Sequence, residues 1–181
     1  MIFRETQLAG AFVVDLEPHV DERGLFARTF CEREFAAHGL AVRYPQQNTS
    51  FNRSAGTLRG MHWQVAPHAE AKLVRCTAGA IYDVIVDLRR NSPTRLAWFA
   101  VELSARNRSA LYIPEGFAHG FLTLEPETEI AYLMSESYAP EAARGMRFDE
   151  PRVGIEWPSP PVVISPRDLA YPEFDDAWLQ D

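Results

Sequence analysis

Two histidines stand in short β-prone segments that carry other polar groups. His62 lies within Thr57–Gln64, and His119 follows the turn that begins at Pro114. Lys72 lies between these segments and is the only lysine among the 18 basic residues. An imidazole titrates near neutral pH and can accept or return a proton, and a compact ammonium suits sites where a planar guanidinium will not do. These residues are candidates for acid–base chemistry, although a lone histidine on a strand is more often structural.

The segment around His62 interrupts the regular alternation of a strand. Strict alternation would place Arg59 on one face and His62 on the other. Gly60 lies between them, and a glycine inside a strand predicts a bulge or a close approach of two backbones. We therefore expect the alternation to fail at this point. Asp83 and Asp87 alternate with apolar residues further along the chain, and we assign them no catalytic role.

The elements that must position these groups are mostly strands. Helix signals are few, and the best candidate is 31–40, which has early acidic residues and Gly39 near its end. Many short strands between turn signals predict an all-β sandwich or barrel with an N-terminal strand arm and a short C-terminal helical tail. The expected strands are 12–16, 25–30, 44–50, 57–64, 72–78, 80–88, 98–103, 109–113, 118–123, 129–135 and 162–165. We expect a single domain over residues 1–181.

Composition excludes several classes of protein. The net charge is −7, so attraction to nucleic acid or to an anionic membrane is not expected. The apolar runs are far shorter than the roughly 20 residues of a membrane span, and the first ten residues do not have the pattern of a signal peptide. Only two cysteines occur, Cys31 and Cys76, which is typical of a reduced cytoplasmic protein.

The spacing of the polar groups resembles that of the cupin jelly roll. Gly56 precedes His62 by the interval of the first cupin motif, and Pro114–His119 matches the P-x-G-x-x-H of the second. The positions of the two remaining metal ligands hold Gln64 and Lys72. The resemblance implies a jelly roll in which a lysine replaces the metal, because an ammonium beside two imidazoles would repel a divalent cation.

A closer resemblance covers nearly the whole chain. The sequence is similar to the dTDP-4-dehydrorhamnose 3,5-epimerase family, whose members invert the centres that flank a 4-keto group on a nucleotide-linked 6-deoxyhexose. The matching segments are Asp21–Gly24, Gln46–Ser50, Leu58–Gln64, Lys72–Val74, Asp83–Arg89, Ser92–Thr94, Ile113–Phe121, Tyr138–Pro140, Gly154–Pro158 and Ile164–Asp168, together with Phe26 and Tyr132.

This resemblance implies a set of catalytic roles. His62 would be the base, and Asp168 would fix its tautomer and steady the imidazolium that forms. Tyr132 would be the acid on the opposite face of the sugar. Lys72 would hold the enolate oxygen, and His119 would add a hydrogen bond there. No cofactor or metal is required, because the substrate already contains the ketone.

The resemblance also implies how the nucleotide sugar is bound. Arg23 and Arg59 would bind phosphate or nucleotide, because a guanidinium fork suits phosphate oxygens. Phe26 could stack on the base, and Gln46 and Asn48 would supply amide contacts. Members of the family are homodimers that exchange N-terminal strands, so the neighbouring subunit is expected to complete part of each site.

Several alternatives remain open at this point. Trp63 stands where the family usually has tyrosine, Glu70 stands where glutamine is common, and Phe148–Asp149 replaces a frequent Trp-Asn. These departures leave open the nucleotide, the sugar configuration and the number of centres inverted. The alternatives are a single-centre epimerase, a 3,4-ketoisomerase, a metal-dependent cupin, or a binding module without catalysis.

Overall fold

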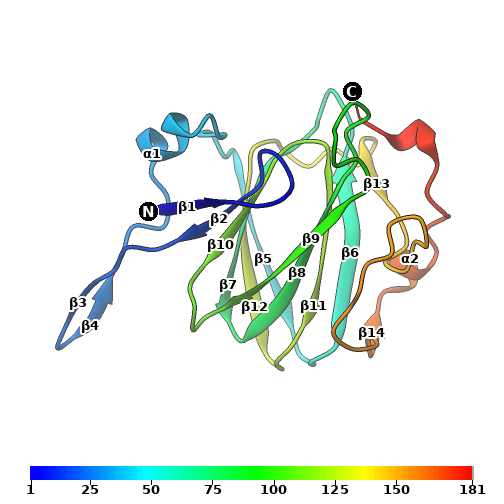
Figure 1. Cartoon of the computed structure of the whole chain (residues 1–181). Coiled ribbons are helices and arrows are strands. Elements are labelled where there is room, and N and C mark those ends of the chain that lie inside the picture. Colours follow the sequence, from blue (N-terminus) through cyan, green and yellow to red (C-terminus); the bar gives the residue numbers. More distant parts are fainter. Residues whose placement is uncertain (181) are drawn as a thin grey trace.

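Two facing β-sheets build most of the molecule, which a computed structural model describes over residues 1–180 (Figure 1). The first sheet has six strands in the order β1-β2-β10-β7-β12-β5, and the second has the order β13-β6-β11-β8-β9, with β14 pairing parallel to β6. The other pairings are antiparallel. The prediction of an all-β fold is therefore confirmed.

The strand bounds follow the predicted runs with few exceptions. The first sheet comprises β1 (Ile2–Glu5), β2 (Phe12–Asp15), β5 (Gln46–Asn52), β7 (Lys72–Ala78), β10 (Ala110–Ile113) and β12 (Thr128–Met134). The second comprises β6 (Thr57–Gln64), β8 (Ala80–Asp87), β9 (Trp98–Ser104), β11 (Phe117–Thr123), β13 (Ala143–Gly145) and β14 (Val163–Ile164). Strands β1 and β13 were not expected from the sequence.

The predicted strand 25–30 is wrong in its length. The structure forms only β4 (Gly24–Phe26), which pairs with β3 (His19–Asp21) in a separate two-stranded sheet. This hairpin projects away from the sandwich, and all six of its residues are exposed (Figure 1). The predicted helix is confirmed as the shorter α1 (Glu32–Ala37), which ends before Gly39, where φ is +69°.

Strand β8 supplies the centre of the molecule because both of its faces are buried. Its inward face carries Ile81 and Ile85, which pack in the core between the two sheets with Leu111 and Ile130 of the first sheet. Its outward face carries Val84 and Val86, which pack, together with Leu88 directly after the strand, with Phe174 and Leu179 of the C-terminal segment. That segment follows the short helix α2 (Pro166–Leu169) and contains a 3-10 turn at Asp176–Trp178. The C-terminal segment thus covers the second sheet from outside.

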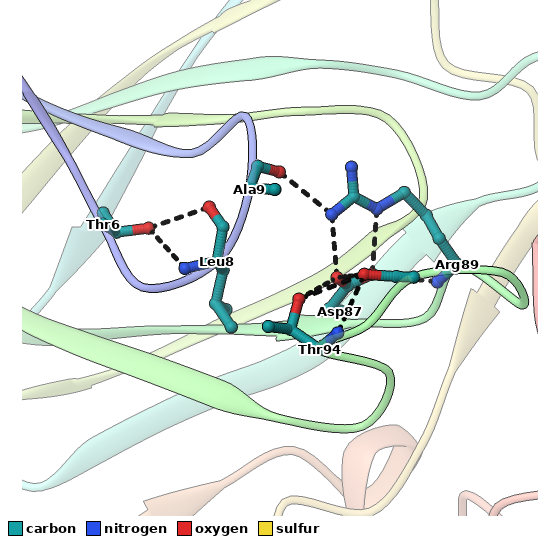
Figure 2. A network of polar contacts seen from close by, with 7 residues as sticks. Thr6, Leu8, Ala9, Asp87, Arg89 and Thr94 are labelled. Carbon is teal, nitrogen blue, oxygen red and sulfur yellow. Dashed lines mark hydrogen bonds and ion pairs between the residues drawn. The ribbon is translucent and has the colours of Figure 1, made fainter.

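The inward face of β8 also carries two aspartates, both fully buried. Asp87 accepts hydrogen bonds from Arg89 Nε at 2.9 Å, Ser92 Oγ at 2.6 Å and Thr94 Oγ1 at 2.7 Å. Arg89 continues the network to the carbonyl oxygen of Ala9 at 2.9 Å, as Figure 2 shows. Burial by itself would raise the pKa of Asp87, but these hydrogen bonds outweigh it and lower the pKa. Asp87 therefore joins the loop after β8 to the N-terminal loop.

No helix in residues 1–180 is long and apolar enough to cross a bilayer.

We expect Asp87→Asn to lower the free energy of unfolding by about 2 kcal/mol, because the charged acceptor of several hydrogen bonds is lost. Urea unfolding followed by circular dichroism measures this change. Since the pKa of Asp87 is lowered in the folded state, the difference should be present at neutral pH and shrink as the pH falls below about 4. Asp149→Asn, at an exposed pair with Arg147, should cost less than about 1 kcal/mol. Equal losses in the two variants would contradict the assignment.

Candidate active site

A pocket of about 370 Å³ opens between the two sheets. Strands β5, β7 and β12 of the first sheet contribute side chains to it, as do β6 and β11 of the second sheet and helix α2. The lining residues are Asn48, Ser50, Arg59, His62, Lys72, His119, Phe121, Tyr132, Met134, Ser165, Arg167 and Asp168. Seven of the ten site residues expected from the sequence therefore lie around one cavity.

The irregularity predicted at Gly60 brings Arg59 and His62 to the same pocket. His62 pairs with His119, but Arg59 pairs with Phe121, so two residues of β6 lie opposite the single residue Gly120. A Cβ atom on Gly60 would lie 2.6 Å from the Cα atom of Gly120. The extra residue is a β-bulge, and it reverses the alternation of the strand. Both predicted features, the bulge and the close backbone approach, are confirmed.

His62 and Asp168 form a hydrogen-bonded couple across a long stretch of chain. His62 Nε2 lies 2.8 Å from Asp168 Oδ1, and the histidine side chain is 41% exposed whereas the aspartate side chain is 5% exposed. An ionised carboxylate can only accept, so Nε2 must carry the proton, and Nδ1 remains as the nitrogen that can accept one. The couple has the arrangement of a general base with its orienting acid.

Helix α2 fixes the position of Asp168. The side chain of Ser165 caps this helix and accepts a hydrogen bond from the Asp168 backbone N–H at 3.1 Å. The Gly60 backbone N–H approaches the second carboxylate oxygen at 3.4 Å. Burial would raise the pKa of Asp168, but the hydrogen bond and the charge of His62 outweigh burial, and the pKa is lowered. Asp168 therefore stays ionised beside the imidazole.

The opposite wall of the pocket belongs to the first sheet and holds Tyr132. Burial raises the pKa of Tyr132 well above its ordinary value, and the negative charge of Asp83 raises it further. The phenol therefore remains protonated at neutral pH and can act as a proton donor. Because His62 stands on β6 and Tyr132 on β12, base and acid approach the cavity from facing sheets.

His119 is held by a second carboxylate, which the sequence analysis did not select. His119 Nε2 lies 2.7 Å from Asp83 Oδ1, and the two side chains are 5% and 0% exposed. The other oxygen of Asp83 is buried and has no hydrogen-bond partner among residues 1–180. The ring of His119 lies 6.2 Å from that of Tyr132 in an edge-on arrangement. The carboxylate makes Nε2 the donor, which fixes how His119 presents its ring to the cavity.

The remaining predicted residues of the pocket wall are also placed. The Lys72 ammonium donates to the carbonyl oxygen of His62 at 3.3 Å. Arg59 Nε donates to the side-chain oxygen of Asn52 at 2.8 Å. Asn48 lines the cavity. Gln46, the first residue of β5, donates a hydrogen bond from Nε2 to Asn48 Oδ1 at 3.2 Å.

Arg23 and Phe26 do not line this cavity. Both belong to the projecting β3–β4 hairpin, where the Arg23 side chain is 84% exposed and Phe26 is 77% exposed. Within one subunit the structure therefore does not bring them to His62.

Five lining residues were missed by the sequence analysis, namely Ser50, Phe121, Met134, Ser165 and Arg167. Arg167 stands directly before Asp168. A cation next to a predicted catalytic aspartate is a signal that could have selected it. The apolar members carry no such signal, because their types are those of ordinary core residues.

The donor set does not fit a bound metal ion. In the cupin pattern, metal ligands would stand at the positions of His62, Gln64, Lys72 and His119. Gln64 instead accepts a hydrogen bond from the backbone N–H of Ala139 at 2.7 Å, and Lys72 brings a positive charge that opposes a divalent cation. Among residues 1–180, no group of three or more His, Cys, Asp or Glu side chains could hold a metal ion.

Solved structures with the same fold place the chain in a class. A Mycobacterium tuberculosis epimerase superposes with a TM-score of 0.94 at 36% identity, covering 99% of this chain and 94% of that one. An epimerase from Legionella pneumophila, solved in complex with dTDP-4-keto-L-rhamnose, gives 0.91 at 34% identity, covering 99% and 97%. A 3′-monoepimerase from Streptomyces bikiniensis, in complex with dTDP-quinovose, gives 0.85 at 32% identity, covering 93% and 85%. The protein is therefore a cupin-type jelly roll of the sugar-nucleotide epimerase class.

Sequence comparisons identify the family within that class. The dTDP-4-dehydrorhamnose 3,5-epimerase family matches residues 5–176. The enzyme of that name from Methanothermobacter thermautotrophicus is 45% identical over 97% of this chain and 92% of its own length, and that from Sinorhizobium fredii is 40% identical over 96% and 90%. The chain belongs to the dTDP-4-dehydrorhamnose 3,5-epimerase family, and the resemblance seen in the sequence is confirmed.

We expect Asp83→Asn to change the hydrogen bond that holds His119. The low-field ring N–H proton of His119 should shift upfield in ¹H–¹⁵N spectra of histidine-labelled protein, because a neutral amide accepts more weakly than a carboxylate. Asp87→Asn is the matched control, since Asp87 is equally buried on the same face of β8 but bonds to Arg89, Ser92 and Thr94. An unchanged His119 signal in Asp83→Asn would show that the carboxylate does not orient the ring.

Proposed function

We propose that this chain is an isomerase that epimerises a dTDP-linked 4-keto-6-deoxyhexose at carbons 3 and 5, in dTDP-rhamnose biosynthesis. The observation that carries the proposal is the approach of His62 and Tyr132 to one cavity from two facing sheets. The family to which the chain belongs, and the dTDP-sugar complex of the Legionella relative, support the substrate class. The proposal assigns the reaction to a reducing compartment, the cytoplasm, in keeping with two free cysteines.

Proton abstraction is the first step of the proposed mechanism. A hydrogen on a carbon beside a ketone is weakly acidic, because the resulting carbanion delocalises onto the carbonyl oxygen as an enolate. Nδ1 of His62 takes the proton, and Asp168 stabilises the imidazolium that forms. His62 is accessible enough to reach a sugar ring, since its side chain is 41% exposed while its partner is buried.

Stabilisation of the enolate and return of the proton complete each inversion. The Lys72 ammonium faces the cavity and would receive the negative oxygen, where a positive charge lowers the barrier most. Because Nε2 of His119 donates to Asp83, this ring would donate a second hydrogen bond to that oxygen only through a protonated Nδ1. Tyr132 then delivers a proton to the face opposite His62, so the configuration at that carbon is inverted. Burial, and then the charge of Asp83, raise the pKa of Tyr132, so the phenol carries a proton when the enolate forms.

The diphosphate of the substrate requires cations in a protein of net charge −7. Arg59 and Arg167 line the cavity together with Lys72, so cations that could bind a diphosphate are present in the cavity wall. Asn48 and Gln46 stand at the same end and can supply amide contacts. Arg23 and Phe26 would reach the nucleotide from the hairpin of the partner subunit in a homodimer, which accounts for an exposed phenylalanine on a projecting arm.

A single-centre epimerase is the second candidate. The similarity to a 3′-monoepimerase, at a TM-score of 0.85 and 32% identity, favours this alternative over a 3,4-ketoisomerase. Inversion at one carbon needs the same base, acid and enolate-stabilising group, so the residues above do not separate the two activities. The count of carbons that exchange hydrogen with solvent does separate them.

We expect wild-type protein in deuterated water to place deuterium at carbons 3 and 5 of the dTDP-4-keto sugar, as observed by proton NMR. His62→Ala should lower the exchange rate about 10³-fold at both carbons, because the base is lost. Affinity for dTDP should stay within about threefold, since the base acts on the sugar. His68→Ala is the matched control on a loop, with a side chain 40% exposed, and it should exchange like wild type. Deuterium at one carbon alone would select the single-centre enzyme.

Subunit complementation tests whether the hairpin completes the partner's site. Co-expressed Arg23→Glu and His62→Ala chains should form mixed dimers with one intact site, because His62 comes from one chain and Arg23 from the other. Turnover should then exceed that of either variant alone. Mixtures of His62→Ala with Asp168→Asn should show no such rescue, because that couple lies within one chain. The homodimer proposal fails if sedimentation finds a monomer at the assay concentration, or if the first mixture stays inactive.

A further inference from the structure

Lys72 has a partner that the mechanism does not use. Its ammonium lies 3.1 Å from Glu70 Oε1, and each of these two side chains is only 8% exposed. The second contact of the ammonium is the carbonyl oxygen of His62, at 3.3 Å. A carboxylate is therefore buried directly beside the cation that faces the cavity.

The chain around Glu70 is held firmly. Ala71, which lies between Glu70 and Lys72, donates its backbone N–H to Ser135 Oγ at 2.7 Å and accepts from the Ser135 N–H at 2.9 Å. Glu70 and Lys72 are two residues apart in extended chain, so their side chains leave the backbone on the same side. The pair therefore stands on a fixed segment beside the start of β7.

A buried ion pair is a weak source of stability, because removing two charges from water costs about as much as their attraction returns. The Glu70–Lys72 pair instead affects the direction in which the ammonium points. An ammonium has three N–H donors on a flexible four-carbon stem, and the stem alone does not aim them. Two donors are engaged by Glu70 and by the His62 carbonyl oxygen. The third is left to point into the cavity that Lys72 lines.

We propose that Glu70 is a positioning residue that orients the Lys72 ammonium toward the substrate's ketone oxygen. The inference rests on the proposed function, because the ketone oxygen is the atom that the ammonium serves. Glu70 does not line the cavity, so it acts through Lys72 and not on the substrate. Its contribution should be greatest when the oxygen becomes negative, and it should therefore appear in kcat more than in KM.

The sole lysine provides a readout that does not depend on activity. Protein grown with lysine labelled with ¹³C at the ε-carbon gives one signal from this chain. In wild type the two ε-protons of Lys72 should have different chemical shifts, because the ammonium is held in one place. In Glu70→Ala they should collapse toward a single shift, since the side chain becomes free to rotate.

Kinetics of deuterium exchange supply the second measurement. We expect Glu70→Ala to lower kcat about 10- to 100-fold, the scale that misplacement of a catalytic group produces, with KM within about threefold. Glu70→Gln keeps an acceptor oxygen without the charge, so it should fall between Glu70→Ala and wild type. It also keeps the test usable if the alanine variant does not fold.

Glu150→Gln is the matched control, because Glu150 is 2% exposed and accepts hydrogen bonds from the backbone N–H groups of Arg152 and Phe174. It should lower stability and leave both kcat and the Lys72 signal unchanged. An unchanged kcat or unchanged ε-protons in Glu70→Ala would overturn the inference, as would a rise in KM alone. If wild type exchanges no deuterium, the proposed function fails, and the Lys72 signal still decides whether Glu70 holds the ammonium.

Discussion

The hydrogen bond between His62 and Asp168 is the constraint on which the rest of the site depends. It joins the middle of β6 to the short helix α2, and 106 positions of sequence separate the two residues. The carboxylate decides which ring nitrogen carries the proton, so it also decides which one is free to act as a base. The chain brings the two residues together because β14 pairs parallel with β6 and leads directly into α2 (Figure 1). Beyond α2, Phe174 and Leu179 pack against the outer face of β8.

The same physical device occurs three times around the cavity. His62, His119 and Lys72 each lie within hydrogen-bond distance of a carboxylate, and the carboxylate side chains are at most 8% exposed. Inside a protein the low dielectric strengthens such contacts and makes an unpaired charge costly. Each carboxylate thus fixes one donor of its partner and leaves the partner's remaining group to the cavity. In an acidic protein, buried carboxylates can in this way orient the groups that face the cavity.

The sequence could predict those parts of the structure that local chemistry determines. Alternation and turn residues predicted most strands, and Gly60 predicted the bulge, since only a residue without a side chain allows the approach to Gly120. His62, Lys72 and His119 were selected by their residue types and context, and the family resemblance added Tyr132 and Asp168, which spacing alone could not have joined to them across so long a chain. Asp83 was passed over because an aspartate between apolar residues on a strand can face either side. Only the packing of the two sheets shows that it faces inward, toward His119. The length of the strand predicted at 25–30 was misjudged because the β3–β4 hairpin is exposed, so burial does not determine where it ends.

The position of Lys72 indicates how a jelly roll can place a positive charge in its cavity with a side chain in place of a metal ion. A metal ligand site needs several neutral or anionic donors that converge on one point, and the convergence of β6, β7 and β11 supplies the geometry. Here one of the converging groups is the ammonium of Lys72, so a side chain supplies the positive charge. The consequence is a positive charge with only one donor left to aim at the substrate, since two oxygens already hold the ammonium. A lone ammonium would meet the ketone oxygen in many orientations. Held between Glu70 and the His62 carbonyl oxygen, the ammonium is tied by a hydrogen bond to β6, the same strand that carries His62.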